Sequence, residues 1–123
     1  CIFRSPLMIG GELTKLDEFT LKLLTNEEIL SMHKNARHSH QVWRKEINGI
    51  EHILWTASCC RGGTYAAVFN TGERESDTEI PLCCLELYGS VKGKELWSGK
   101  ESVFDGAVKV KIPSHGAKAF YFE

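Results

Sequence analysis

Hydrophobic and polar residues follow two different periods along the chain. In residues 14–24, apolar side chains recur at helical spacing, which predicts an amphipathic helix that opens on a capping box of Thr14 and Asp17. Asn26 is a suitable N-cap for a second helix that runs from Glu27 to about His33. From about residue 41 the apolar residues alternate with polar ones, which is typical of β-strands.

Turn residues divide this second part into short strands. Asn48-Gly49 is a strong signal for a two-residue hairpin, and Gly62-Gly63 marks a further turn. The predicted strands are residues 41–47, 51–57, 64–70, 78–87, 91–97, 108–112 and 117–122. About seven short strands with turns between them predict an antiparallel β-sandwich of the Greek-key type, so the chain is expected to be mainly β.

The stretch from Ser5 to Gly11 has a different character. It is a short apolar run closed by two glycines and followed by a helix, which is typical of a buried parallel strand. A parallel strand requires a parallel partner and helices on its faces, and no second strand–helix unit follows. We therefore expect this stretch to be the strand of the last strand–helix unit of a larger sheet or barrel whose other parts lie outside these 123 residues.

Residues 34–41 are polar and aperiodic, which predicts a linker between two domains. We place the boundary at residue 38. Residues 1–38 are then the strand and helices left from the barrel, and residues 39–123 are the β-sandwich.

Composition and charge narrow the function classes. The formal net charge is −1, which argues against a nucleic-acid partner because binding to phosphates requires a basic surface. No run approaches the roughly 18 apolar residues of a membrane span, and no signal-peptide pattern occurs at the start, so no membrane partner is expected.

Four of the five cysteines form two adjacent pairs, Cys59-Cys60 and Cys83-Cys84. Zinc sites favour cysteines separated by two to four residues, and adjacent residues of a strand point to opposite faces. Free thiols in a reducing compartment are therefore the favoured interpretation, which points to the cytoplasm. One bridge between the two pairs, or a metal site, remains the alternative.

The titratable residues form no catalytic pattern. The sequence has no phosphate-binding glycine loop, nucleophile elbow or His-Glu-x-x-His motif, and we expect no cofactor. Asp17 is predicted to cap a helix, and Asp77 and Asp105 are predicted to lie in turns. His33, His38 and His40 are the one cluster that could bind a metal, but no nearby carboxylate or thiol completes a ligand set, so we predict none.

The three tryptophans, Trp43, Trp55 and Trp97, lie in predicted strands. A sandwich core uses tryptophan as a large apolar filler, whereas an exposed ring can stack on a sugar. The core role is favoured, and a sugar platform remains the alternative.

Several motifs resemble family 27 glycoside hydrolases, the α-galactosidases and α-N-acetylgalactosaminidases. Residues 5–13, the helix after them, and residues 25–30 are similar to the end of that family's catalytic barrel. The resemblance therefore implies that residues 1–38 are the last strand and helices of a truncated (β/α)8 barrel. Residues 65–70, 95–97 and 112–117 resemble its C-terminal β domain more loosely. One departure is His33-Lys34-Asn35, where the family usually has Asn-Gln-Asp.

The resemblance implies a parent enzyme that hydrolyses terminal α-galactosyl linkages by a retaining mechanism with two aspartates. By the same resemblance both aspartates lie upstream of residue 1, so no catalytic residue is assigned and the chain alone is expected to be inactive. Glu12, at the rim where barrel active sites form, is a weak candidate for substrate contact. The alternatives are a stand-alone carbohydrate-binding module and a purely structural accessory domain.

Six apolar side chains would lack their barrel neighbours in the isolated chain: Leu7, Met8, Ile9, Leu16, Phe19 and Leu23. Exposed apolar surface favours association. We therefore expect a homo-oligomer or aggregation in solution.

Overall fold

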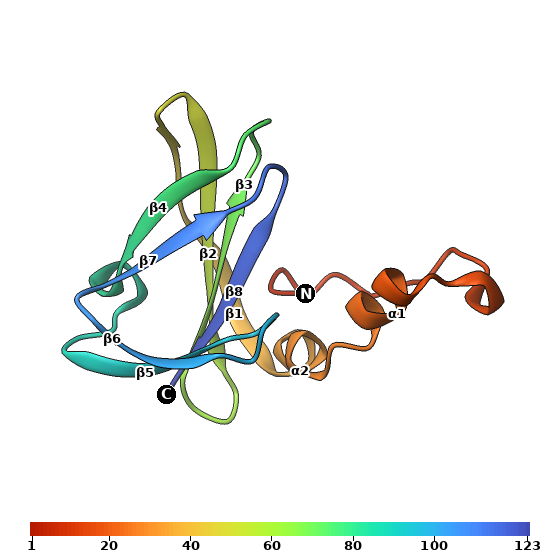
Figure 1. The fold of residues 1–123 in the computed structure, drawn as a ribbon. Coiled ribbons are helices and arrows are strands. Elements are labelled where there is room, and N and C mark those ends of the chain that lie inside the picture. Colours follow the sequence, from red (N-terminus) through yellow and green to blue (C-terminus); the bar gives the residue numbers. More distant parts are fainter.

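A computed structural model describes all residues from 1 to 123, as a helical N-terminal segment followed by a β domain (Figure 1). The segment contains the 3-10 turn η1 (Leu13–Lys15) and the helices α1 (Glu18–Leu24) and α2 (Glu27–Asn35). The β domain consists of β1 (Ala36–Ile47), β2 (Ile50–Cys59), β3 (Thr64–Asn70), β4 (Ser76–Pro81), the 3-10 turn η2 (Leu82–Leu85), β5 (Ser90–Glu95), β6 (Glu101–Asp105), β7 (Ala107–Ile112) and β8 (Ala117–Phe122).

The strands form two antiparallel layers, which confirms the predicted β-sandwich. The large sheet has six strands in the order β1-β2-β3-β8-β5-β6, and the small one pairs β4 with β7. Between the layers lies an apolar core, here called the inner cluster. Its buried members are Leu54, Ala66, Val68, Ile80, Leu82, Leu85, Val91, Val108, Ile112, Phe120 and Phe122.

The central strands of the large sheet are buried on their second face as well. In β3, Ala66 and Val68 belong to the inner cluster, while Tyr65 and Ala67 belong to a second core on the opposite side. This outer cluster consists of Ile2, Ile29, Met32, Ala36, Ala57, Tyr65, Ala67, Leu96 and Ala119. Because α2 and the chain start contribute to it, the helical segment is packed onto the sheet rather than tethered to it.

Turn chemistry fixes the register at both ends of β2. Ile47 pairs with Ile50, and the two residues between them, Asn48 and Gly49, have φ values of 53° and 76°, as a two-residue type I′ hairpin requires. Gly63 has φ of 84°, and a Cβ built on it would lie 2.4 Å from the Phe122 carbonyl oxygen. Only glycine fits that approach of the β2–β3 turn to β8.

The helices begin where the caps predict, with one correction. Asn26 caps α2, since its Oδ1 accepts from the Ile29 backbone N–H at 2.9 Å. Asp17 caps α1 by accepting from the Thr20 N–H at 2.6 Å, so the helix begins at Glu18. The predicted capping box is wrong, because the Thr14 hydroxyl donates to Glu12 instead.

The predicted strand at Ser5–Gly11 does not form in this structure. These residues pair with no strand, and Leu7, Met8 and Ile9 are exposed. A lone parallel strand cannot pair its backbone N–H and C=O groups without a neighbouring strand, and residues 5–11 have no such neighbour here.

The predicted linker at 34–41 is wrong, since β1 already begins at Ala36, whose side chain is fully buried. The prediction failed because β1 is an edge strand with one side facing solvent, so many of its residues are polar. Its pairing with β2 is also irregular between Arg37 and His40, where His38 has φ of 53°. The domain boundary at residue 38 stays a prediction.

Two strand predictions also require correction. The strand predicted at 78–87 ends at Pro81, after which residues 82–85 form η2. Residues 101–105 form β6, an unpredicted edge strand, which brings the total to eight. Its two apolar residues, Val103 and Phe104, are adjacent rather than alternating, and Val103 is 66% exposed, so the strand pattern is short and weak.

The two methionines give a matched test of the outer cluster. Met32 is 3% exposed beneath the sheet, whereas Met8 is 87% exposed. Met32→Ala is expected to lower the free energy of unfolding by about 3 kcal/mol, through lost burial and the cavity left behind. Met8→Ala serves as the control and should change it by less than about 0.5 kcal/mol. Equal effects in urea denaturation would contradict the packing of α2 on the sheet.

Candidate functional site

Glu12, the weak substrate-contact candidate, lies at the entry to the helical segment. Its carboxylate accepts from the Thr14 hydroxyl at 2.7 Å and pairs with Lys15 Nζ at 3.3 Å, and all three side chains are exposed. Gly10 and Gly11 before it are surrounded by open space. The contacts of Glu12 are those of a residue that shapes a turn, and contact with a substrate stays a prediction.

The three aspartates lie on different elements. Asp17 caps α1, and the hydrogen bond from Thr20 holds the pKa of its carboxyl below the usual value. Asp77 lies within β4 opposite Lys111 of β7, so its predicted turn role is wrong, and Asp105 is the last residue of β6. No salt bridge or hydrogen bond joins any of the three to another titratable side chain.

The histidines make local contacts. His33 Nε2 lies 2.8 Å from the Ser5 carbonyl oxygen and His40 Nδ1 lies 2.9 Å from that of His38, so each of these nitrogens carries the proton it donates. His115 Nε2 lies 3.0 Å from Glu73 Oε2 and joins two loops. No three histidine, cysteine or acidic side chains are grouped as a metal site would require.

The tryptophans differ in environment. Trp43 packs against the inner cluster, with Lys45 Nζ 4.1 Å from its ring centroid, and Trp55 packs against the outer cluster. Trp97 follows β5 and is 37% exposed. The core interpretation therefore describes Trp43 and Trp55, which are half-buried, and Trp97 is the most exposed of the three.

All five cysteines are free thiols. The Cys59 thiol lies 3.7 Å from the Tyr65 hydroxyl, and burial, with a smaller effect of Cys59, raises the pKa of Tyr65 to about 12. Burial also raises the pKa of the Cys84 thiol. Such a shift disfavours the thiolate, which is the opposite of what a nucleophilic cysteine requires.

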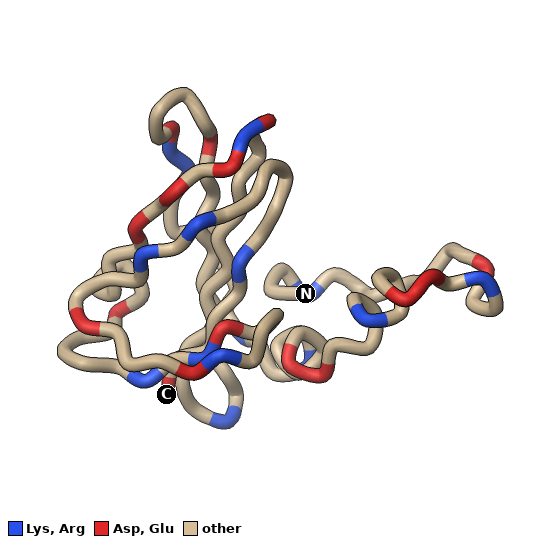
Figure 2. Tube along the Cα trace, viewed as in Figure 1, with Lys and Arg blue, Asp and Glu red and all other residues tan.

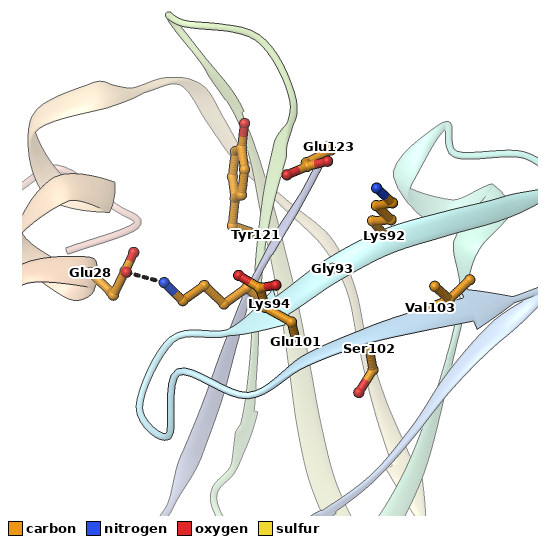
Figure 3. Close-up of a pocket in the computed structure, with 9 residues that line it drawn as sticks. All are labelled: Glu28, Lys92, Gly93, Lys94, Glu101, Ser102, Val103, Tyr121 and Glu123. Carbon is orange, nitrogen blue, oxygen red and sulfur yellow. Dashed lines mark hydrogen bonds and ion pairs between the residues drawn. The ribbon is translucent and has the colours of Figure 1, made fainter.

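A polar groove of about 520 Å³ separates α2 from the β5–β6 ribbon (Figure 3). It is lined by Glu28, Lys92, Gly93, Lys94, Glu101, Ser102, Val103, Tyr121 and Glu123. In Figure 3 the Lys94 side chain extends along the groove toward Glu28 of α2.

Lys94 and Glu28 form an ion pair across this groove. The hydrogen bond from Lys94 to Glu28, supported by the charges of Glu28 and Glu101, holds the pKa of the ammonium above its usual value. A lysine shifted in this direction stays protonated near neutral pH and cannot act as a base there. The groove therefore connects α2 to the sheet through a charge pair whose lysine is not a general base.

The sequence alone did not reveal this pair. Glu28 was visible only as one of two acidic residues at the start of a helix, where they favour the helix dipole. Lys94 lies 66 positions away, and only the packing of α2 on the outer face of the sheet brings the two together.

The other conspicuous surface is apolar and lies on the helical segment. Exposed large side chains gather there, and residues 5–11 carry no charge, as Figure 2 shows. This apolar N-terminal surface consists of Leu7, Met8, Ile9, Leu13, Phe19, Leu21 and Leu23. Exposed large apolar side chains concentrated on one segment are typical of a site of contact with other protein. None of the helices is long and apolar enough to cross a bilayer.

The fold and these surfaces define a class, a β-sandwich domain fused through a shared core to a helical segment with an uncovered apolar side. A family model of the alpha-galactosidase C-terminal β-sandwich domain matches residues 49–122. The match covers more than half of the chain, and the chain belongs to this family.

Similar proteins include longer enzymes. An alpha-galactosidase of Cyamopsis tetragonoloba is 22% identical over 95% of the chain and 29% of its own length. A GH27 β-L-arabinopyranosidase of Geobacillus stearothermophilus has a TM-score of 0.90 and 34% identity over 99% of the chain and 27% of its own. A putative α-N-acetylgalactosaminidase of Bacillus halodurans has a TM-score of 0.88 and 28% identity over 99% of the chain and 28% of its own.

These comparisons confirm the family resemblance read from the sequence. The chain spans less than a third of the length of each of these relatives. In all three the match covers the helical segment as well as the β domain, since 95% or more of the chain is aligned.

The ion pair between α2 and β5 has a pH signature. The folded-state pKa of Lys94 is raised, so the stabilisation is fully present below the ordinary lysine pKa and is lost as pH rises through the folded value. Glu28→Gln should therefore cost about 0.5 kcal/mol of unfolding free energy at pH 8 and low salt, as measured in urea. The difference should vanish well above pH 10.

The exposed pair Lys15–Glu12 provides the control. Lys15→Gln should leave the unfolding free energy unchanged within about 0.3 kcal/mol at either pH. If Glu28→Gln behaves like this control at pH 8, the pair does not hold α2 to the sheet.

Proposed function

We propose that the chain acts as the C-terminal part of a family 27 glycoside hydrolase that cleaves terminal α-galactosyl linkages. The observation that carries this proposal is the joint match of the helical segment and the β domain to longer glycosidases, at 34% identity over 99% of the chain in one case. The apolar N-terminal surface supports it, because a catalytic barrel packed there would cover Leu7, Met8 and Ile9.

In this proposal the chain supplies the accessory domain and the parent supplies the chemistry. Retaining glycosidases place two carboxyl groups about 5 Å apart, one as nucleophile and one as acid and base. The aspartates of this chain lie on separate elements and have no such partner, so the chain alone is proposed to be inactive. Neither a metal nor an organic cofactor is required by this mechanism.

The role of the β domain would be mechanical. Ile29, Met32 and Ala36 bury one side of α2 against the sheet, while Leu7, Met8 and Ile9, which precede the helices, remain exposed. The segment would then be held between two cores, one in the sandwich and one in the barrel. A domain bound in this way stabilises the barrel without touching the substrate.

A second substrate is favoured by one observation. The relative with 34% identity is a β-L-arabinopyranosidase, whereas the alpha-galactosidase of Cyamopsis tetragonoloba is 22% identical. The two sugars share the configuration of their pyranose ring and differ by one hydroxymethyl group. β-L-Arabinopyranoside is therefore the second candidate substrate of the parent.

We also propose a reducing compartment, the cytoplasm, for this protein. The support is that five free thiols, including the exposed Cys60 and Cys83, persist only where disulfide formation is suppressed.

An assay of the isolated chain tests where the chemistry lies. Residues 1–123 should give no turnover of chromogenic α-galactoside or β-L-arabinopyranoside above the buffer rate, because the proposed carboxylate pair is absent. The Geobacillus stearothermophilus relative is the positive control for the second substrate. Turnover by the chain that survives purification and is lost on unfolding would contradict the proposal.

A chimera tests the accessory role through the activity that the hybrid enzyme retains. The matching 27% of the Geobacillus stearothermophilus enzyme is replaced by this chain. The chimera should fold and keep at least about a tenth of the kcat/KM of its parent, a loss of about 1.4 kcal/mol. The same enzyme cut before the replaced part is the control and should be insoluble or inactive. A chimera no better than that control would argue against the proposal.

The apolar N-terminal surface also predicts self-association of the isolated chain. Light scattering should show dimers or larger species at micromolar concentration. The double variant Met8→Lys and Phe19→Lys should shift the chain toward monomers, because both side chains are more than two-thirds exposed and the changes do not disturb the core. A wild-type chain that stays monomeric would contradict this expectation.

A further inference from the structure

A second groove, of about 570 Å³, lies between α1 and the β domain. One wall is α1, and the other is formed by the turn after β5 and by the β7–β8 turn. Its volume is in the range of small-molecule sites. It shares no residue with the groove around Lys94, and Leu7, Met8 and Ile9, which the proposed barrel would cover, do not line it.

Trp97, in the turn after β5, lines this groove and lies outside both cores of the domain. It belongs to neither the inner nor the outer cluster and is 37% exposed. Its backbone is nevertheless fixed by Glu95, whose side chain is only 11% exposed. The Glu95 carboxylate accepts from the Trp97 N–H at 3.3 Å and from the Ser98 N–H at 2.8 Å. A large aromatic residue that is held in place without filling a core is typical of a binding surface.

The opposite wall supplies a second aromatic ring. Phe19 and Lys22 are three positions apart on α1, so both side chains lie on the face that lines the groove. The two walls are joined beside Trp97, because Asn26 Nδ2 donates to the carbonyl oxygen of Leu96 at 3.4 Å. Phe19 and Trp97 therefore line one groove from two connected elements.

The charged side chains of the lining are cationic. Lys22 and Lys118 line the groove, and none of the lining residues is acidic. Lys118 Nζ lies 3.9 Å from Glu95, and His115 Nε2 lies 3.0 Å from Glu73, whereas Lys22 forms no salt bridge. A complementary ligand therefore has apolar faces, several hydrogen-bond acceptors and a negative charge.

We propose that this groove binds an acidic sugar, a hexuronate, whose ring packs against Phe19 and Trp97 and whose carboxylate pairs with Lys22. The C–H faces of a pyranose ring fit the apolar surface of aromatic side chains. Its hydroxyl groups accept from the remaining donors of the lining, such as Lys118. An aromatic acid lacks these hydroxyls, and a neutral sugar leaves Lys22 without a counter-charge. The site does not rest on the proposed glycosidase activity.

Nuclear magnetic resonance of the tryptophan indole N–H groups tests the site during titration with D-galacturonate. The titration uses the Met8→Lys variant, because Met8 is exposed outside the groove and its substitution reduces self-association. The Trp97 resonance, identified by its loss in Trp97→Phe, should shift saturably with a Kd of about 1 mM, as expected for a ligand of this size. Trp55, which packs against the outer cluster, should not respond. No shift of Trp97 at about twenty times that concentration would overturn the proposal.

Two further ligands test the chemical class. Galactose, which lacks the carboxylate, and benzoate, which lacks the hydroxyls, should each bind at least about tenfold more weakly than galacturonate. Lys22→Gln should remove the preference for galacturonate over galactose, whereas the control Lys15→Gln changes an exposed lysine outside the groove and should keep it. Equal affinity for galactose in the unsubstituted groove would overturn the acidic ligand, and equal affinity for benzoate would overturn the sugar.

The aromatic contact has its own matched pair of variants. Trp97→Ala should weaken galacturonate binding at least about tenfold, because the ring that packs against the sugar is lost. Tyr88→Ala is the control, since Tyr88 is an aromatic residue, 78% exposed, that does not line the groove. It should leave the affinity unchanged. Retained binding in Trp97→Ala, or an equal loss in both variants, would overturn the proposal.

Discussion

The structure depends on the burial of both faces of the three central strands β2, β3 and β8. One face meets β4 and β7 across the inner cluster, and the other meets α2 and the chain start across the outer cluster. Small residues make the second contact possible, since Ala57, Ala67 and Ala119 let the Ile29 and Met32 side chains approach the sheet. The helical segment and the β domain consequently share one core, although their sequences have different periods.

This arrangement gives the surfaces of the chain their separate roles. Where α2 meets the sheet, the segment is closed by the outer cluster and by the Glu28–Lys94 pair, while the residues before α2 expose Leu7, Met8 and Ile9. In the proposed parent, these exposed residues meet the catalytic barrel. The chain belongs to the alpha-galactosidase C-terminal β-sandwich family, and the role proposed for it is to support a catalytic barrel.

Local chemistry made much of the fold predictable. The Asn48-Gly49 turn fixed one hairpin and Asn26 fixed the start of α2, because each acts through its own backbone. Features that depend on distant partners were not predictable. Polar β1 resembles a linker until β2 pairs with it, and Ser5–Gly11 resembles a strand although no partner strand is in reach. The Lys94–Glu28 pair arises only from packing, because the two residues are 66 positions apart in the sequence. The motifs near the chain start predicted the family correctly because they depend on residue identity as well as on periodicity.

Native-state hydrogen exchange tests the shared core most directly. The amide protons at the centre of α2, from Leu30 to Met32, are compared with those of Ala66 and Val68 in β3. If the outer cluster joins helix and sheet into one cooperative unit, both sets exchange only through global unfolding and report the same free energy. Amides of α2 that exchange several kcal/mol more easily than those of β3 would show that the helix opens alone, which would contradict the account.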